Sequence, residues 1–370
     1  MGFTHTQAED PAYLTEQIIT YLGNKRALLN LIGAGVQQVL QRTGKTRLAC
    51  MDAFSGSGIV ARFLKQYSHT LYANDLEDYA RVINACYLAN ATEALRAQLG
   101  ETLRGVEGQI RRGWRRGFIA EQYAPQDDTC IRPGERVFYT RRNAEYIDTA
   151  RQVIAELPSE LQGFFLAPLL YGASVHTNTA GVFKGFYKNS DGVGQFGGSG
   201  RNAQQRILAD IRLQVPVFSR FEADVHVLQT DAADAVRAAG ELDLAYLDPP
   251  YNQHPYGSNY FMLNLITRYA PPRETSRVAG IPADWKRSAF NKRPAAQDAL
   301  FKVIEACPAA FIMISYNSEG FVGREELLDH LGRLGRVSVM ETPYNTFRGC
   351  RNLRNRDIRV SEYLFLLERN

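Results

Sequence analysis

The sequence lacks any cysteine or histidine pattern that would hold a metal ion or a disulfide framework. None of the five cysteines forms a CxxC pair, and the six histidines form no HExxH or similar ligand motif. We therefore expect neither a structural zinc site nor disulfides, and predict a reduced, cytosolic protein without a bound metal.

Long apolar runs are also missing. No stretch of about 18 apolar residues is present, so we expect no membrane span. The first residues lack the apolar core of a signal peptide, so we expect no secretory leader. What is present is a chain of 370 residues with 45% hydrophobic and 22% charged residues. This composition is globular and allows a large core, and the net charge of +4 is compatible with a nucleic-acid partner without requiring one.

Strands and helices alternate in the first part of the chain. Apolar spacing predicts a helix over 24–42, a strand over 47–54 and a helix over 59–67. A second strand is predicted over 69–75 and a helix over 76–99. Strands that alternate with helices in this way form parallel sheets, so the pattern predicts an α/β fold.

The same pattern resumes after the middle of the chain. Apolar strands are predicted over 225–231, 242–248 and 309–316. Two late strands, over 336–341 and 358–367, are expected to pair antiparallel at the sheet edge. The prediction is therefore a sheet of seven strands in total.

A long segment separates the two groups of strands. It contains predicted helices over 143–156 and 160–174, and loops rich in Gly, Asn and Ser over 176–203. Its length argues against a structureless loop and favours a separate functional lobe. The expected domain bounds are 1–100, 101–222 and 223–370, with the lobe inserted between two parts of one sheet domain.

The first predicted strand ends in a glycine-rich turn. In Asp52-Ala-Phe-Ser-Gly56-Ser-Gly58-Ile-Val-Ala61, the glycines allow a tight turn and close approach of a ligand, and Ala61 allows close helix packing. Asp75 ends the next strand, where a carboxylate can bind both hydroxyls of a ribose. This pattern predicts a nucleotide site. The alternatives are a glycine turn without a ligand, and a nicotinamide dehydrogenase for which no hydride-transfer site follows.

Asp248-Pro249-Pro250-Tyr251 is the most informative tetrapeptide of the sequence. It follows a short apolar strand, so it is predicted to lie at the carboxyl edge of the sheet beside the nucleotide site. The two prolines fix φ and remove two N–H donors, which leaves the carbonyl of Pro249 as an acceptor. Asp248 supplies a second acceptor and Tyr251 an aromatic face. The alternative interpretation is a strand-ending turn with an aspartate cap.

Two neighbouring acceptors suit an exocyclic amino group such as that of adenine. If each accepts one N–H, the nitrogen becomes more tetrahedral and its lone pair can point at a methyl–sulfonium carbon for in-line displacement. Stacking on Tyr251 would hold the base, at roughly 1–3 kcal/mol per base. A base within a duplex must first be flipped out. No metal is needed for this chemistry.

These motifs resemble the D12 class, or Dam-like, DNA adenine-N6 methyltransferases, and the resemblance covers most of the chain. It implies a Rossmann-like seven-stranded methyltransferase sheet with helices on both faces and an inserted target-recognition lobe. It also implies S-adenosylmethionine as the cofactor, DNA as a partner, and a cytoplasmic enzyme of bacterial or phage origin. A companion restriction endonuclease is compatible with the same resemblance.

The resemblance also assigns site residues. Tyr21-Leu-Gly23-Asn-Lys25 looks like the family's N-terminal cofactor motif, which implies that Tyr21 and Lys25 contact the methionine portion. Asp231 ends the strand before the catalytic motif, where relatives contact the cofactor's adenine; an N-cap of the following helix is an equal alternative. The predicted cofactor site comprises Tyr21, Gly23, Lys25, Asp52, Phe54, Ser55, Gly56, Gly58, Asp75, Asp231 and Asp248. The predicted catalytic residues are Asp248, Pro249, Pro250 and Tyr251.

Basic residues gather in three segments outside these motifs, two in the insertion and one near the C-terminus. Phosphate contact is a natural use for them, and a solvated basic face is the alternative. The predicted DNA contacts are Arg111, Arg112, Arg115, Arg116, Lys184, Lys188, Arg201, Arg348 and Arg351.

Three rival functions remain at this point. Cytosine-N4 methyltransferases use similar geometry but commonly carry Ser where this chain has Asp248, and RNA or protein amino-group methyltransferases usually carry Asn there. A DNA-binding module with a decayed catalytic site is disfavoured because no residue of the catalytic motif is lost.

Overall fold

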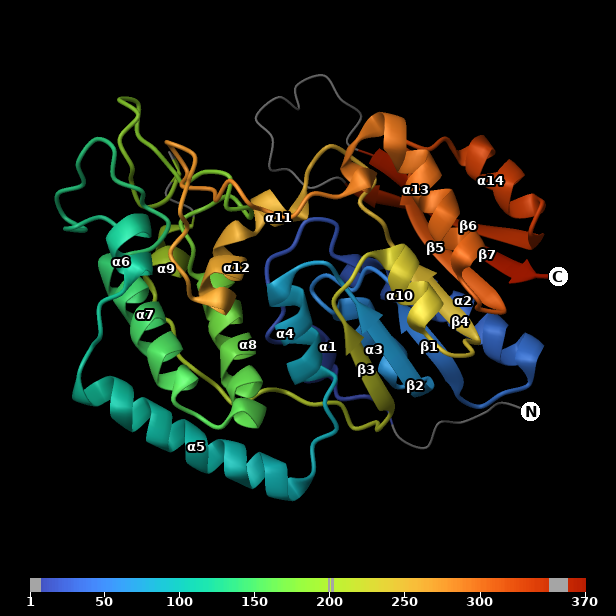
Figure 1. The fold of residues 1–370 in the computed structure, drawn as a ribbon, viewed down its shortest axis with the longest axis horizontal. Helices are drawn as coiled ribbons and strands as arrows, with labels where there is room; N and C mark the ends of the chain where they lie inside the picture. Colours follow the sequence, from blue (N-terminus) through green and yellow to red (C-terminus); the bar gives the residue numbers. More distant parts are fainter. Residues whose placement is uncertain (1–7, 199, 201–202, 346–358) are drawn as a thin grey trace.

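Seven strands form one mixed sheet. The computed structural model describes residues 8–198, 200, 203–345 and 359–370 (Figure 1). Across the sheet the strands run in the order β3-β2-β1-β4-β5-β7-β6, which confirms the predicted number and the α/β class. The strands are β1 Leu48–Asp52, β2 Ser68–Asn74, β3 Asp224–Leu228, β4 Leu244–Leu247, β5 Phe311–Asn317, β6 Gly335–Asn345 and β7 Arg359–Arg369.

Strand direction changes at one edge of the sheet. The five strands from β3 to β5 are mutually parallel. By contrast, β7 is antiparallel to both β5 and β6, so the predicted late antiparallel pair is confirmed. Because the chain moves outward to β2 and β3 after β1 but returns to the other side for β4, the strand order reverses between β1 and β4.

Different helices cover the two faces of the sheet. Successive side chains of a strand point to opposite faces. In β1, Leu48 and Cys50 pack with α2 and α3, whereas Ala49 and Met51 pack with α10, α13 and α14. The helices are α1 Pro11–Thr15, η1 Lys25–Leu28, α2 Leu29–Thr43, α3 Ile59–Lys65, α4 Asp78–Tyr87, α5 Glu93–Arg112, α6 Phe118–Tyr123, α7 Arg141–Ala155, α8 Ser159–Val175, α9 Gln204–Leu208, α10 Ala232–Ala238, α11 Tyr256–Asn259, α12 Phe261–Arg268, η2 Ala289–Asn291, α13 Arg293–Ala306 and α14 Arg324–Gly332.

The prediction of one helix over 76–99 is wrong. The chain forms α4, leaves the helix after Tyr87, and begins α5 at Glu93. Thr92 sets the new start, because its hydroxyl accepts a hydrogen bond from the N–H of Leu95 at 3.2 Å. Asn90 holds the break in place through the carbonyl of Ala223 at 2.8 Å. As a result α5 runs through the domain boundary expected at residue 100.

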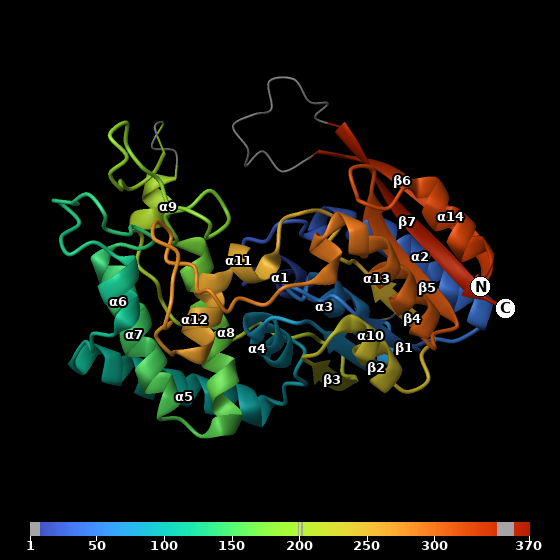
Figure 2. The ribbon, with the colours of Figure 1, turned by 45° about the horizontal axis from the view of Figure 1, so that its top comes forward.

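The inserted segment folds as a helical lobe beside the sheet (Figures 1 and 2). The predicted helices over 143–156 and 160–174 are confirmed as α7 and α8. The lobe shares one hydrophobic core with α4 and with α12, which follows β4 in the chain; this core contains Tyr79, Ile147, Phe165 and Phe261. The lobe is therefore built partly from residues of the sheet domain, and α11 lies between the two parts in both views.

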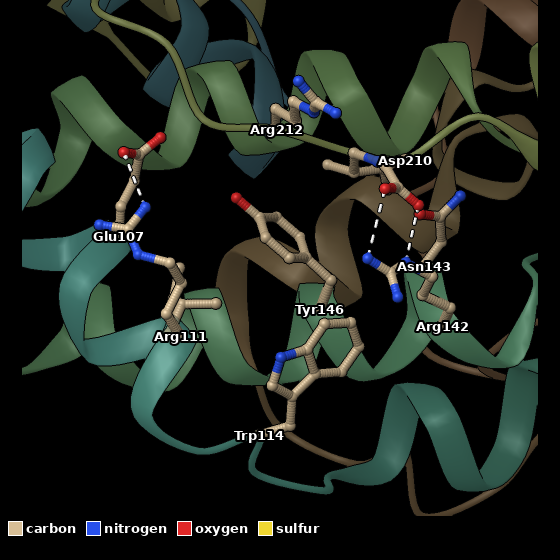
Figure 3. Close-up of a pocket in the computed structure, with 10 residues that line it drawn as sticks. Glu107, Arg111, Trp114, Arg142, Asn143, Tyr146, Asp210 and Arg212 are labelled. Atoms are coloured by element: carbon tan, nitrogen blue, oxygen red, sulfur yellow. Dashed lines mark hydrogen bonds and ion pairs between the residues drawn. The ribbon is translucent and has the colours of Figure 1, made fainter.

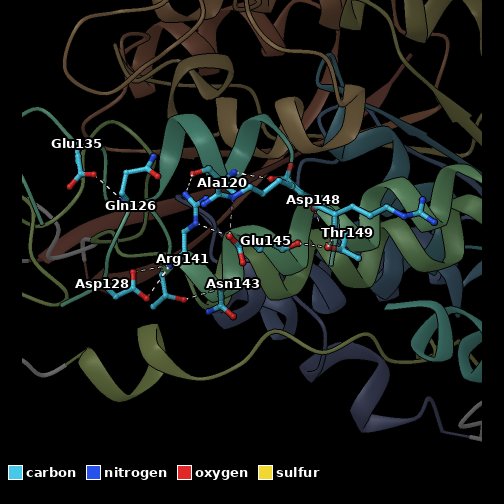
Figure 4. A network of polar contacts seen from close by, with 12 residues as sticks. Ala120, Gln126, Asp128, Glu135, Arg141, Asn143, Glu145, Asp148 and Thr149 are labelled. Carbon is cyan, nitrogen blue, oxygen red and sulfur yellow. Dashed lines mark hydrogen bonds and ion pairs between the residues drawn. The ribbon is translucent and has the colours of Figure 1, made fainter. Parts of the chain in front are cut away.

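A buried carboxylate joins three of these helices (Figure 4). Asp148 in α7 is fully buried and accepts the N–H of Ala120 in α6 at 2.8 Å. It also accepts the hydroxyl of Tyr269, at the end of α12, at 2.8 Å. Arg141, the first residue of α7, forms an ion pair at 2.8 Å with Glu145, one turn later, in the same network. None of the helices in the described part of the chain is long and apolar enough to cross a membrane.

Candidate active site

The ends of three parallel strands bring carboxylates together at the carboxyl edge of the sheet. Asp52 ends β1, Asp75 follows β2, and Asp248 follows β4. These strands flank the point where the strand order reverses, which is where open α/β sheets form their ligand crevice. The sequence prediction that the nucleotide motif and the Asp-Pro-Pro-Tyr turn lie at one edge is confirmed by this strand arrangement.

Asp75 holds the glycine-rich turn in shape. One carboxylate oxygen accepts the N–H of Gly56 at 2.9 Å, and the other accepts the N–H of Glu77 at 2.8 Å. Burial raises the pKa of Asp75, while these hydrogen bonds oppose the rise. Gly56 and Gly58 have φ values of 48° and 80°, where a side chain would be strained. A Cβ on Gly56 would also lie 2.8 Å from the ring of Tyr21.

Lys25 and Asp248 form an ion pair at 2.9 Å, with side-chain exposures of 5% and 17%. Burial acts to lower the pKa of Lys25, but Asp248 together with Tyr251, Tyr246 and Glu362 outweighs burial, and the pKa lies well above its ordinary value. Burial raises the pKa of Asp248, and Lys25 opposes this. Lys25 is therefore charged. Its ammonium also donates to the carbonyl of Gly23 at 3.2 Å and lies 5.5 Å from the ring centre of Tyr251.

Two further buried acids lie around this ion pair. Asp52 is 1% exposed, and neither of its carboxylate oxygens has a hydrogen-bond partner among the described residues. Burial and the nearby charge of Asp248 raise the pKa of Asp52 well above its ordinary value. Glu362 in β7 is 2% exposed, and one of its oxygens has no hydrogen-bond partner within the described part of the chain. Burial and the charge of Asp248 raise the pKa of Glu362, whereas the charge of Lys25 lowers it. Lys25 therefore stabilises the charged form of Glu362 as well as that of Asp248.

A cavity of about 90 Å³ opens among these elements. Of the predicted site residues, those lining it are Tyr21, Gly23, Phe54, Asp75, Asp231, Asp248 and Pro250. The others surround it without forming its wall: Lys25, Asp52, Ser55, Gly56, Gly58, Pro249 and Tyr251. Ser55 supports the turn, because its hydroxyl donates to the carbonyl of Asn74 at 3.0 Å.

Asp231 caps a helix and also faces the cavity. One carboxylate oxygen accepts the N–H of Ala233 at 2.9 Å, so the residue caps α10. The same side chain lines the cavity. A helix cap and a ligand-facing carboxylate are therefore compatible here.

The structure adds wall residues that the sequence did not single out. The segment over 286–291 crosses the cavity, with Phe290 packed edge-on against Phe54 at 5.2 Å between ring centres. Lys286 forms an ion pair with Asp78 at 2.8 Å, which ties this segment to the start of α4. No motif marks it, because its contribution depends on tertiary packing of a polar loop. Tyr256 also lines the cavity, and its place just after the Asp-Pro-Pro-Tyr turn is the signal that could have identified it.

A larger cavity of about 520 Å³ lies in the helical lobe and is lined by Trp114, Tyr146 and several arginines (Figure 3). Several of its polar groups already have partners. Arg142 pairs with Asp210 at 2.7 Å, and the hydroxyl of Tyr146 accepts the N–H of Leu213 at 3.1 Å. Reactive acids with unmet hydrogen-bonding capacity occur instead at the sheet edge, so the smaller cavity is the candidate active site.

The predicted DNA contacts fall into different surroundings. Three arginines near the end of α5 pair with acids of the lobe: Arg111 with Glu107, Arg115 with Glu156, and Arg116 with Glu145. Arg112, in the last turn of α5, borders a shallow surface hollow. In Figures 1 and 2, α5 runs along the side of the lobe away from α11.

Of the two predicted lysine contacts, Lys184 lies near the catalytic turn. Lys184 is close enough to His254, just after the Asp-Pro-Pro-Tyr turn, that its charge adds to burial in lowering the pKa of that imidazole. The ammonium of Lys188 lies over the ring of Phe186, 5.1 Å from the ring centre. Arg201, Arg348 and Arg351 lie outside the described residues.

Sheet order, glycine-rich turn and acidic edge together define an α/β methyltransferase. The chain matches the family of D12 class N6 adenine-specific DNA methyltransferases over residues 21–293. It belongs to this family and is a site-specific DNA methyltransferase.

Curated relatives match this chain over nearly its whole length. The chain is 29% identical to the type II methyltransferase M.NlaIII of Neisseria lactamica, over 95% of this chain and 99% of that protein. It is 27% identical to the type II methyltransferase M.CviAII of Paramecium bursaria Chlorella virus 1, over 94% and 98%. Its identity to the modification methylase StsI of Streptococcus sanguinis is 25%, over 94% of this chain but only 52% of that longer protein.

Proposed function

We propose that this enzyme transfers a methyl group from S-adenosylmethionine to the N6 amino group of a flipped-out adenine in DNA. One observation carries the proposal: Asp248 and Pro250 of the catalytic turn line the same cavity as Asp75 and Asp231 of the nucleotide motif. Methyl donor and acceptor amino group would therefore meet at one point of the sheet edge.

The cavity residues fit the cofactor. S-adenosylmethionine supplies an electrophilic methyl group on a positively charged sulfur. Asp75 would bind the ribose hydroxyls, and Asp231 with Phe54 would hold the adenine end. Lys25 and Asp248 would lie at the methionine end. Typical sites for ligands of this size measure about 300–1,000 Å³, so the segment over 286–291 would move outward on binding.

Asp248 and the carbonyl of Pro249 would accept the two hydrogens of the adenine amino group. Lys25 occupies one oxygen of Asp248 and leaves the other for this contact. The ion pair also keeps the carboxylate charged and fixes its direction, which is the alignment that in-line displacement requires. Asp248 would accept the proton that N6 gives up on taking the methyl group, which the sulfonium donor would supply as it becomes a neutral thioether.

The protein surface offers supports for the flipped nucleotide. Tyr251 would stack on the base. Lys184, whose charge acts on His254 just after the catalytic turn, would contact a backbone phosphate near the target base. The remaining predicted contacts, Arg111, Arg112, Arg115, Arg116, Lys188, Arg201, Arg348 and Arg351, stay proposals. Because relatives are named type II methyltransferases and modification methylases, we propose that this enzyme also acts beside a restriction endonuclease.

Labelled S-adenosylmethionine and genomic DNA, followed by nucleoside analysis, test the proposal. We expect N6-methyladenine; N4-methylcytosine alone, or activity confined to RNA or protein, would reject it. We expect Asp248→Ala to abolish turnover with little loss of DNA affinity. Asp329→Ala is the matched control, because that carboxylate is 69% exposed on α14 and should leave turnover unchanged.

A further inference from the structure

The backbone N–H and carbonyl of Leu22 are both hydrogen-bonded to tyrosines that follow the catalytic turn. Its N–H donates to the hydroxyl of Tyr260 at 2.6 Å. The hydroxyl of Tyr256 donates to its carbonyl at 3.1 Å. Tyr260 is fully buried, so the loss of its hydrogen bond to Leu22 would be costly. The N-terminal cofactor motif is thus bound directly to the segment behind Asp248.

The rings of the same two tyrosines also pack against Tyr21. Its ring stacks on Tyr256 at 4.9 Å and on Tyr260 at 4.7 Å between ring centres. Its hydroxyl lies 3.2 Å from that of buried Tyr79. On its other side the ring lies so close to Gly56 that no side chain would fit there. One residue therefore contacts both the glycine-rich turn and the segment after the catalytic turn.

A short path of contacts leads from Tyr260 to the catalytic carboxylate. Gly23 follows Leu22, and its carbonyl accepts the ammonium of Lys25 at 3.2 Å. Lys25 in turn pairs with Asp248 at 2.9 Å. If the Leu22 peptide shifts, the Gly23 carbonyl and the ammonium shift with it. A displacement of about 1 Å is enough to cost a methyl transfer its alignment.

We propose that Tyr260 is a positioning residue for methyl transfer: it fixes the Leu22 peptide so that Lys25 holds Asp248 in its reactive orientation. Tyr256 supports the same peptide from its carbonyl side. The inference rests on the proposed methylation of adenine by S-adenosylmethionine. If Tyr260 served only as core filling, its hydroxyl contact with Leu22 would be dispensable, and loss of that hydroxyl would leave Lys25 in place.

Tyr260→Phe tests this role because it removes one oxygen and keeps the ring. Tyr139→Phe is the matched control, since the hydroxyl of Tyr139 is buried in the described structure without a hydrogen-bond partner. Single-turnover methylation is measured from pH 5 to 9 with cofactor and DNA saturating. We expect Tyr260→Phe to lower the rate about 10-fold, the scale of one buried hydrogen bond lost, and Tyr139→Phe to leave it unchanged.

The pH profile separates positioning from general damage. A displaced Lys25 no longer offsets the burial of Asp248, so the acid limb of the Tyr260→Phe profile should move to higher pH. Other charged groups near Asp248 stay in place in this variant. The groups that face Asp248 are Lys25, Asp52, Tyr246, Tyr251, Tyr256 and Glu362.

A second variant tests the path itself. In a Lys25→Met background the positioned group is absent, so adding Tyr260→Phe should change the rate less than about 2-fold. Should Tyr260→Phe fail to fold, Tyr256→Phe probes the same peptide from its other side. An unshifted acid limb, or equal effects of Tyr260→Phe with and without Lys25, would overturn the inference. Absence of N6-methyladenine with the wild-type enzyme would instead reject the proposed function.

Discussion

Replacing Lys25 by Met probes the ion pair on which the proposed chemistry depends. The methionine side chain keeps nearly the same length and removes the ammonium that lies 2.9 Å from Asp248. Both side chains are largely buried, so Asp248 would be left as a poorly solvated charge. Breaking a buried pair in this way typically costs about 3–5 kcal/mol. A loss on that scale corresponds to at least about 100-fold in rate if the charged form is the active one.

Asp248 can relieve this cost by taking up a proton. Burial already raises its pKa, and removal of Lys25 raises it further. The proposed acceptor is the carboxylate, so the variant's rate should rise with pH over a range in which the wild-type rate is flat. Stability should respond with the opposite sign. A carboxyl group whose pKa is higher in the folded state than in the unfolded state loses stability as pH rises between the two values.

Single-turnover rates and urea unfolding at several pH values between 5 and 9 measure both slopes. Lys45→Met is a matched control, because Lys45 pairs with Asp243 at 2.7 Å but is 51% exposed. Such a pair is worth about 0–1 kcal/mol, and we expect no change in rate. A Lys25→Met enzyme with wild-type activity at every pH, or one whose rate and stability rise together with pH, would refute the reasoning.

Three further substitutions test the site and its support. Asp75→Ala should weaken cofactor binding by about 1–3 kcal/mol in calorimetry, and unchanged affinity would remove this carboxylate from the site. Asp148→Asn should destabilise the fold by about 1–3 kcal/mol in urea, because the acceptor for Tyr269 and for the first turn of α6 is weakened; an unaltered midpoint would contradict this. Burial raises the pKa of Glu77 to about 7 despite its hydrogen bond from Asn264, so its ionisation opposes folding as pH rises from 4.5 to 7. Glu77→Gln should therefore raise the melting temperature at pH 8 but not at pH 4, and an equal rise at both would argue against burial of the charge.

Motifs that depend on backbone conformation were predictable from the sequence. Gly56 and Gly58 adopt positive φ, and the Asp-Pro-Pro-Tyr turn follows an apolar strand as expected. Such features are local, because they follow from chain stereochemistry at a strand end. The seven strands were predictable for the same reason, since each is a short apolar run.

Features set by tertiary contacts were not predictable. The break between α4 and α5 depends on the contact between Asn90 and Ala223, which lie 133 residues apart. Docking of α12 into the lobe depends on a shared core that includes Phe261. The role of the segment over 286–291 likewise arises only when Lys286 meets Asp78. The sequence shows where basic residues cluster but not what their side chains contact. In the structure, several of these arginines form ion pairs with acids of the lobe.

The charge balance at the sheet edge argues for the kind of ligand as well as its place. Asp52, Asp248 and Glu362 are buried or largely buried carboxylates; among the described residues the ammonium of Lys25 offsets Asp248 and Glu362, whereas the charge of Asp248 adds to the burial of Asp52. Uncompensated acids in such surroundings are costly unless they are neutralised or meet a cation. A pyrophosphate-bearing dinucleotide would add negative charge to this excess, which disfavours the dehydrogenase alternative. A sulfonium donor would bring positive charge to the same place, so the buried acids favour a positively charged ligand over an anionic one.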